Sequence, residues 1–173
     1  NFINKNKETD ILVLNTGGPP DLKFENIDDK IWFEQFSSLF ISFCNLLKGI
    51  NVKKGGYIFL ISSFIIKQPG TDLIISSSIR SGFVSLFKSL SKIQKDKNLS
   101  FINIAPGPIK TDRLINLVKN DKMTMEEFAE TMPAKSVPEP KEIGLFVKFV
   151  VENKIKSLNG VTIPFDSGLL ENI

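Results

Sequence analysis

Polar and glycine-rich segments follow three of the apolar runs in this 173-residue sequence. Asn15-Thr16-Gly17-Gly18 follows the first run, Ser62-Ser63 the second, and Pro106-Gly107-Pro108-Ile109-Lys110-Thr111 the third. Taken singly, each segment has the composition of an ordinary turn. If the apolar runs are parallel strands, however, their carboxyl ends form the edge of the sheet at which ligands bind. The three segments together therefore predict one binding site for a small-molecule substrate.

Two residue types that often carry chemistry are nearly absent from the sequence. It contains no histidine and a single tyrosine, Tyr57. A histidine-based triad, a histidine metal ligand and an imidazole base are therefore excluded, and we expect no metal site. The single cysteine, Cys44, cannot form an internal disulfide. Since it lies in an apolar stretch, it is expected to be a buried hydrophobic side chain in a protein of the reducing cytoplasm.

The charges and the longest apolar run argue against two classes of partner. The sequence has 22 basic and 19 acidic residues, a net charge of +3, and lysines that are scattered without interleaved aromatic residues. Such a distribution does not indicate nucleic-acid binding. The longest apolar run, from Tyr57 to Ile66, is much shorter than the roughly 20 residues of a membrane helix. We therefore predict neither a nucleic-acid partner nor a membrane partner.

The elements that must position the polar segments alternate between strand and helix. Short β-branched and aliphatic runs predict strands over 11–15, 57–62, 100–105 and 160–165, the second introduced by a turn at Gly55-Gly56. Apolar residues at helical spacing predict helices over 29–48, 72–95, 113–119, 125–131 and 140–153. This alternation predicts an α/β fold with a Rossmann-like, doubly wound parallel sheet. No repeat or linker interrupts it, so we expect a single domain spanning 1–173.

The predicted helix from Asp29 to Lys48 is apolar around most of its girth. Ile31, Ile41 and Leu46 lie outside the stripe that would face the sheet. A helix of this kind is usually buried on more than one side. We therefore expect it to face a second subunit in a homodimer or homotetramer, with Phe40 and Phe43 at the contact.

Five segments, in their order and spacing, resemble the short-chain dehydrogenase/reductase family, and within it the 3-oxoacyl-acyl-carrier-protein reductases. ILVLNTGG resembles the family's fourth strand with its Asn-Ala-Gly signature, and YIFLISS the fifth strand ending in the active-site serine. SIRSGFVSLFKSLS resembles the helix after the catalytic Tyr-x-x-x-Lys pair. SFINIAPGPIKTDRL resembles the sixth strand with its Pro-Gly-x-x-x-Thr loop, and GVTIPFDSG the last strand. The final LLENI is similar to family tails that pack across subunits.

The resemblance implies a dinucleotide cofactor, NAD or NADP. It implies that Asn15 and Gly17 lie on the adenosine-ribose side of the cofactor, and that the nicotinamide is surrounded by Pro106, Gly107, Ile109 and Thr111. The family's glycine-rich phosphate loop belongs to its first two strands, and no G-x-G-x-x-G occurs in this sequence. We expect those N-terminal strands to precede residue 1.

The catalytic positions depart from the family pattern. The resemblance places the family serine at Ser63, but the tyrosine position holds Ser76 and the lysine position holds Arg80. The asparagine of the family's proton relay falls near Gln35. A serine hydroxyl is a far poorer proton donor than a phenol, and arginine does not titrate near neutral pH. We therefore expect an atypical active site in which Ser63, Ser76 and Arg80 bind and polarise the substrate or the cofactor.

The choice of arginine at position 80 is itself informative. Arg80 and Arg113 are the only arginines among the 22 basic residues, so a lysine would be expected at a position without special requirements. A guanidinium can grip ribose hydroxyls or a carboxylate with two parallel hydrogen bonds. The alternatives are that Arg80 is a surface residue paired with an acidic neighbour, and that Arg113 is only a charge at a helix end.

Two functions are consistent with these residues. The first is an NAD(P)-dependent oxidoreductase with an atypical active site, acting on a carbonyl or alcohol substrate. The second is a catalytically idle member of the family that serves as a nucleotide-binding or assembly subunit, and the loss of the tyrosine and lysine favours it.

Overall fold

A parallel sheet forms the centre of the computed structural model, which describes residues 2–5, 7–93 and 95–171. The strands are β1 (Glu8–Leu14), β2 (Asn51–Ile61), β3 (Ser100–Pro106) and β4 (Val161–Phe165), in the spatial order β1-β2-β3-β4. Each neighbouring pair is parallel. The prediction of a parallel α/β sheet is therefore confirmed, and the three polar segments follow β1, β2 and β3 at one edge of it.

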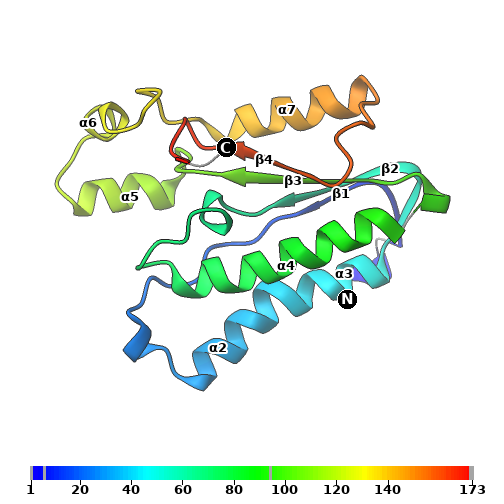
Figure 1. The fold of residues 1–173 in the computed structure, drawn as a ribbon, viewed down its shortest axis with the longest axis horizontal. Helices are drawn as coiled ribbons and strands as arrows, with labels where there is room; N and C mark the ends of the chain where they lie inside the picture. The colour runs from blue at the N-terminus through cyan, green and yellow to red at the C-terminus, as the bar shows by residue number, and fades with distance from the viewer. Residues whose placement is uncertain (1, 6, 94, 172–173) are drawn as a thin grey trace.

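Helices cover both faces of the sheet (Figure 1). They are α1 (Phe2–Lys5), α2 (Asp29–Phe36), α3 (Ser42–Gly49), α4 (Ile74–Ile93), α5 (Asp112–Asn120), α6 (Met125–Glu130) and α7 (Pro140–Glu152). Helices α2, α3 and α4 lie below the sheet in the view of Figure 1, and α7 lies above it. This two-sided covering is the doubly wound arrangement that the alternation of strand and helix predicts.

The alternating side chains of β2 show why both faces need a cover. Ile58 and Leu60 pack into the cluster that contains Phe83 of α4, whereas Phe59 points into the opposite cluster with Val150 of α7. Successive strand residues face opposite sides of a sheet, so a strand that is apolar at every position must be buried on both. Burial of each such side chain contributes about 1.5 to 3 kcal/mol.

A π-helical turn joins α2 and α3. Asp28 caps the start of α2, its carboxylate accepting the backbone N–H of Ile31 at 2.8 Å. Residues Ser37–Ile41 then form the π-helical turn, and α3 continues from it to Gly49. The predicted helix is therefore present over its expected length, with one wide turn in its middle.

The prediction that Phe40 and Phe43 of this helix contact a second subunit is wrong. Phe43 is only 4% exposed, and the ring of Phe40 meets the ring of Phe83 edge-on with centroids 5.3 Å apart. Both side chains belong to the subunit's own core. The aromatic residues that the helix does expose are Phe33, at 75%, and Phe36, at 42%. The helix is apolar around most of its circumference, as predicted, but the aromatic side chains that it exposes lie on α2.

Two further details of the sequence prediction need correction. β2 begins at Asn51, and the Gly55-Gly56 pair lies inside it, at the register shift between Thr9 and Ile11 of β1. Gly55 has a φ of +79°, and a Cβ on Gly56 would lie 2.5 Å from the carbonyl oxygen of Asp10. The pair therefore forms a bulge rather than a turn. The helix predicted over 72–95 is α4, which ends at Ile93, and this side chain is exposed. The last two residues of the LLENI tail lie outside the described residues.

Candidate functional site

A cavity of about 320 Å³ opens where the loops after the strands meet. Residues from all three polar segments and from helices α4 and α5 line it. Six of the nine predicted site residues are among its lining: Ser63, Ser76, Arg80, Gly107, Ile109 and Thr111. The cavity therefore lies at the carboxyl edge of the sheet, where a doubly wound fold binds its ligands.

Arg80 is the central side chain of this cavity. It projects from α4 and is only 8% exposed. Its Nε donates to Ser76 Oγ at 3.1 Å, its Nη1 to the carbonyls of Ile61 and Ser62 at 3.3 and 3.5 Å, and its Nη2 to the carbonyl of Gly17 at 3.4 Å. These contacts exclude the surface ion pair. They tie the loop after β1 to the end of β2.

The guanidinium keeps a donor free for a ligand. An arginine carries five N–H groups, and four of those of Arg80 have the partners just described, so that one Nη2–H has none within the described residues. Burial, with a smaller contribution from the positive charge of Arg113, lowers the pKa of Arg80 below its usual value. Its partners are neutral oxygen atoms. An anionic or hydroxyl-rich ligand would therefore be well placed to stabilise its charge.

The serines of the site have different tasks. Ser62 is buried and donates to the carbonyl of Ile104 at 3.3 Å, so it joins β2 to β3. Ser76 accepts a hydrogen bond from Arg80, which leaves its own hydroxyl hydrogen available. Ser63 is half-buried at the cavity wall. Ser63 and Ser76 can thus bind an oxygen atom, although neither is an acid at neutral pH.

The loop after β3 is shaped by a close backbone approach. A Cβ on Gly107 would lie 2.9 Å from the Cα of Asp166, which follows β4. The buried Asp166 carboxylate accepts the backbone N–H groups of Gly168 and Leu170 at 3.2 and 2.9 Å. Thr111 caps α5, its hydroxyl accepting the N–H of Leu114 at 3.5 Å. Gly107 is therefore required for packing, whatever the loop binds.

Three of the predicted site residues lie outside the lining of the cavity. Asn15 is exposed just beyond β1, and Pro106 is the buried last residue of β3. Gly17 contributes through its carbonyl, which Arg80 binds. Gln35, expected near the proton relay, is half-buried on α2 and also lies outside the lining.

Arg113 is the second arginine at the candidate site, although its place in the sequence is also that of a charge at a helix end. It lies in the first turn of α5, where a basic residue does not suit the helix dipole, and it lines the cavity. Its Nη2 donates to the carbonyl of Pro19 at 3.3 Å and lies 3.4 Å from the carboxylate of Asp21. The rarity of arginine in a lysine-rich sequence is the signal that marks it.

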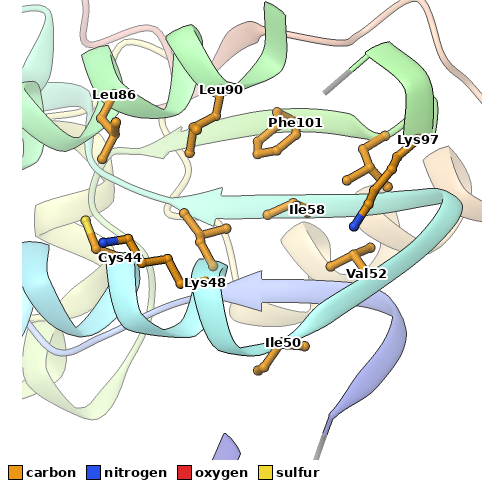
Figure 2. Close-up of a pocket in the computed structure, with 11 residues that line it drawn as sticks. Cys44, Lys48, Ile50, Val52, Ile58, Leu86, Leu90, Lys97 and Phe101 are labelled. Carbon is orange, nitrogen blue, oxygen red and sulfur yellow. The ribbon is translucent and has the colours of Figure 1, made fainter. Parts of the chain in front are cut away.

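A second cavity, also of about 320 Å³, lies between α3, α4 and the sheet (Figure 2). Its walls are largely apolar, with side chains such as Leu86, Leu90 and Phe101, and with two lysines, Lys48 and Lys97. Cys44 is half-buried there and not fully buried as predicted. This cavity has neither the hydroxyl groups nor the loop backbone of the first, so we place the candidate site at the carboxyl edge.

Tyr57 cannot replace the missing tyrosine of the site. It stands on β2 among the side chains that face α7, with Lys156 Nζ 3.6 Å from the centre of its ring. Within residues 2–5, 7–93 and 95–171 there is no cluster of residues that could hold a metal ion. Over the same ranges, no helix has the length and apolar character needed to cross a membrane.

Comparison with known proteins defines the family. The family model described as enoyl-(acyl carrier protein) reductase matches residues 2–170. The uncharacterized oxidoreductase YvaG of Bacillus subtilis is 25% identical over 182 residues, covering 96% of this chain and 69% of the relative. The 3-oxoacyl-[acyl-carrier-protein] reductase FabG of Rickettsia prowazekii is 28% identical over 176 residues, covering 98% of this chain and 71% of FabG.

Solved structures share the fold at lower sequence identity. L-Sorbose reductase from Gluconobacter frateurii, complexed with NADPH and L-sorbose, superposes with a TM-score of 0.86 at 23% identity, covering 96% of this chain and 68% of the reductase. An NADPH-bound short chain oxidoreductase from Pseudomonas aeruginosa with an atypical catalytic center gives 0.81 at 20% identity, covering 95% and 66%. The chain therefore belongs to the short-chain dehydrogenase/reductase family of oxidoreductases.

Proposed function

We propose that this chain is an NAD(P)-dependent oxidoreductase with an atypical active site, which acts on a carbonyl or alcohol substrate. The observation that supports this function best is the meeting of Ser63, Ser76, Arg80 and Thr111 around one cavity at the carboxyl edge of the sheet. The relatives and structural neighbours include reductases that are NADPH-dependent or NADPH-bound by name.

The residues of the cavity fit the nicotinamide half of such a cofactor. The volume of about 320 Å³ is at the lower end of small-molecule pockets, which suits part of a dinucleotide rather than all of it. The free N–H of Arg80 and the hydroxyl of Thr111 are donors for ribose and carboxamide oxygens. The space beside Gly17 is open, because a Cβ added to this residue would meet no atom within 4 Å, so a ligand can approach its backbone closely. The cofactor, when bound, supplies the hydride chemistry.

The chain's own residues then orient and polarise the substrate. The hydroxyl of Ser76, whose oxygen accepts from Arg80, donates to the substrate oxygen, and Ser63 provides a second hydroxyl at the wall. A serine hydroxyl stays protonated at neutral pH, so this site stabilises developing negative charge through hydrogen bonds and the nearby guanidinium. The proton itself comes from solvent.

The second function is a nucleotide-binding or assembly subunit without turnover. It is favoured by one observation: Tyr57, the only tyrosine, faces α7 and does not line the cavity. The oxidoreductase and the nucleotide-binding subunit both predict cofactor binding, so that turnover distinguishes them.

A binding titration and a turnover screen test the two functions together. NADPH and NADH are titrated into the intact protein by calorimetry, and carbonyl and alcohol substrates are screened for cofactor-dependent absorbance change. We expect cofactor binding, together with turnover that falls at least tenfold in Ser76→Ala. Ser78→Ala, an exposed serine on the same helix, is the matched control and keeps full activity. Binding without turnover supports the idle subunit, and loss of both overturns the proposal.

A double variant asks whether the scaffold still orients cofactor and substrate. Ser76→Tyr with Arg80→Lys rebuilds the family's phenol and ammonium, four residues apart on one helical face. A gain of carbonyl reduction by this variant, in a protein that still melts cooperatively, supports a site that has been repurposed. The lysine at position 80 can form fewer hydrogen bonds to the loop carbonyls than Arg80 does, and the double variant is therefore expected to be less stable. Thermal melting, measured beside the assay, shows whether it is still folded.

We further propose that residues 1–173 form one domain and that it assembles as a homodimer or homotetramer in the cytoplasm. The exposed Phe33 and Phe36 on α2 support the assembly. The absence of disulfide pairing, with a single cysteine, is typical of a reducing compartment.

A further inference from the structure

The charged side chains that line the candidate site carry a net positive charge. They are Arg80, Arg113 and Asp21. Both arginines of the sequence therefore lie at one small cavity, although lysine is by far the commoner basic residue in the chain. A guanidinium differs from an ammonium chiefly in its flat, two-pronged fit to a carboxylate.

Arg113 is held only loosely in its present position. Its Nη2 lies 3.4 Å from both carboxylate oxygens of Asp21, and the two side chains are 49% and 39% exposed. Exposed ion pairs of this kind contribute about 0 to 1 kcal/mol. The hydrogen bonds and the ion pair of Arg113 all involve Nη2, so within the described residues its Nη1 and Nε groups have no hydrogen-bond acceptor. Nη1 lies against Gly18, where an added Cβ would be 2.1 Å away. A second carboxylate can thus bind to Arg113, or replace Asp21.

Several apolar side chains share the lining of the cavity with Arg113. Leu114 and Leu117 lie beside it on α5, and Phe64 and Ile65 line the cavity from the segment after β2. The cavity therefore joins a cationic end to an apolar wall. A ligand that matches both has a carboxylate at one end and an aliphatic body.

We propose that Arg113 binds the carboxylate of the substrate, and that the substrates of this site are aliphatic oxo or hydroxy acids. This inference rests on the proposed function for its reaction, but not for the binding itself. Asp21 holds the guanidinium at the cavity wall and competes with the ligand for it.

Binding of two matched probes tests the proposal without any turnover. Hexanoate and hexanamide have the same chain and differ in charge, and each is titrated by calorimetry into the intact protein with and without saturating NADPH. We expect hexanoate to bind at least tenfold more tightly than hexanamide. Arg113→Met abolishes that preference, while Lys119→Met, which removes a charge from an exposed position on the same helix, keeps it. Asp21→Asn increases hexanoate affinity several-fold.

Two results of these titrations would overturn the proposal, and a third would separate it from the proposed oxidoreductase function. Equal affinity for the two probes in the unchanged protein overturns the proposal. So does an Arg113→Met variant that loses NADPH affinity but keeps its preference for hexanoate, because the anion at Arg113 would then be a phosphate of the cofactor. If NADPH does not bind while hexanoate binds through Arg113, the proposed oxidoreductase function fails and this inference stands. Arg113→Lys, which retains the charge, should keep a reduced preference and guards against misfolding of the methionine variant.

Discussion

Arg80 and Arg113 bind the same short loop. Nη2 of Arg80 donates to the carbonyl of Gly17 at 3.4 Å, and Nη2 of Arg113 donates to the carbonyl of Pro19 at 3.3 Å. The two side chains come from α4 and α5, which follow different strands. The loop after β1 is thus held from two helices by side chains rather than by regular secondary structure, and the shape of the cavity depends on both.

Arg80→Ala should lower the free energy of unfolding by about 2 to 4 kcal/mol. The change leaves the carbonyls of Ile61, Ser62 and Gly17 without this donor, and a buried unsatisfied polar group costs about 1 to 3 kcal/mol. Arg80→Lys recovers part of the loss, because an ammonium cannot span all three oxygens. Urea denaturation measures both variants, and an unchanged midpoint in Arg80→Ala would show that solvent replaces the guanidinium at no cost.

Gly107→Ala should destabilise the protein, whereas Gly17→Ala should not. The new Cβ at 107 would lie 2.9 Å from the Cα of Asp166, and backbone cannot move aside as a side chain can. We expect a loss of about 1 to 3 kcal/mol, the usual cost of overpacking. At Gly17 no atom lies within 4 Å of the new Cβ, so its variant is the control and changes stability by less than about 0.5 kcal/mol. Thermal melting of the two variants side by side is the measurement.

Phe33→Glu should reduce the mass of the protein in solution. Phe33 is 75% exposed on α2, and a charge placed there opposes burial against a second subunit. Phe149→Glu on α7, where the phenylalanine is 57% exposed, is the control and leaves the mass unchanged. Multi-angle light scattering distinguishes the two. The prediction is contradicted if the unchanged protein is already a monomer at micromolar concentration.

Acid should loosen α6 through Glu127. Hydrogen bonds from the backbone N–H and then the hydroxyl of Thr124 lower the pKa of this carboxyl, so the folded state favours its charged form. Its contribution is therefore fully present above the unfolded pKa of about 4.3 and is lost as the pH falls through the lower folded value. Hydrogen exchange of the α6 amides, compared between the unchanged protein and Glu127→Gln at each pH, should differ at pH 6 and converge once the pH lies below the lowered folded pKa.

The sequence was sufficient to predict the sheet because its strands are short apolar runs between helical patterns. YIFLI of β2 is buried between two layers of helices. In ILVL of β1 only one face is covered: Leu12 and Leu14 are buried, whereas Ile11 and Val13 are 38% and 47% exposed. The sequence was not sufficient for Gly55-Gly56, since a bulge depends on the neighbouring strand: the backbone of Asp10 on β1 decides it. Local composition cannot distinguish that bulge from a turn.

The site was predictable in its location but not in its hydrogen bonds. The turn chemistry after each strand identified the edge of the sheet, and rarity identified Arg80. The partners of Arg80 are backbone carbonyls, which every residue has, so no sequence pattern could reveal them. The contacts of Arg113 could not be predicted for a similar reason, because those with Pro19 and Asp21 join segments more than ninety residues apart.

The π-helical turn at Ser37–Ile41 acts as a rotational offset between the two halves of one long helix. Each residue of an α-helix advances by about 100° around the axis, so one extra residue turns everything before it by that amount relative to everything after it. Downstream, Phe43 faces the core, while upstream Ile31 and Trp32 pack near Ile75 and leave Phe33 outside. Deleting a single residue from this turn would rotate Ile31 and Trp32 off Ile75 and swing Phe33 to a new side. The number of residues in this one turn therefore determines the direction in which the exposed Phe33 of α2 points.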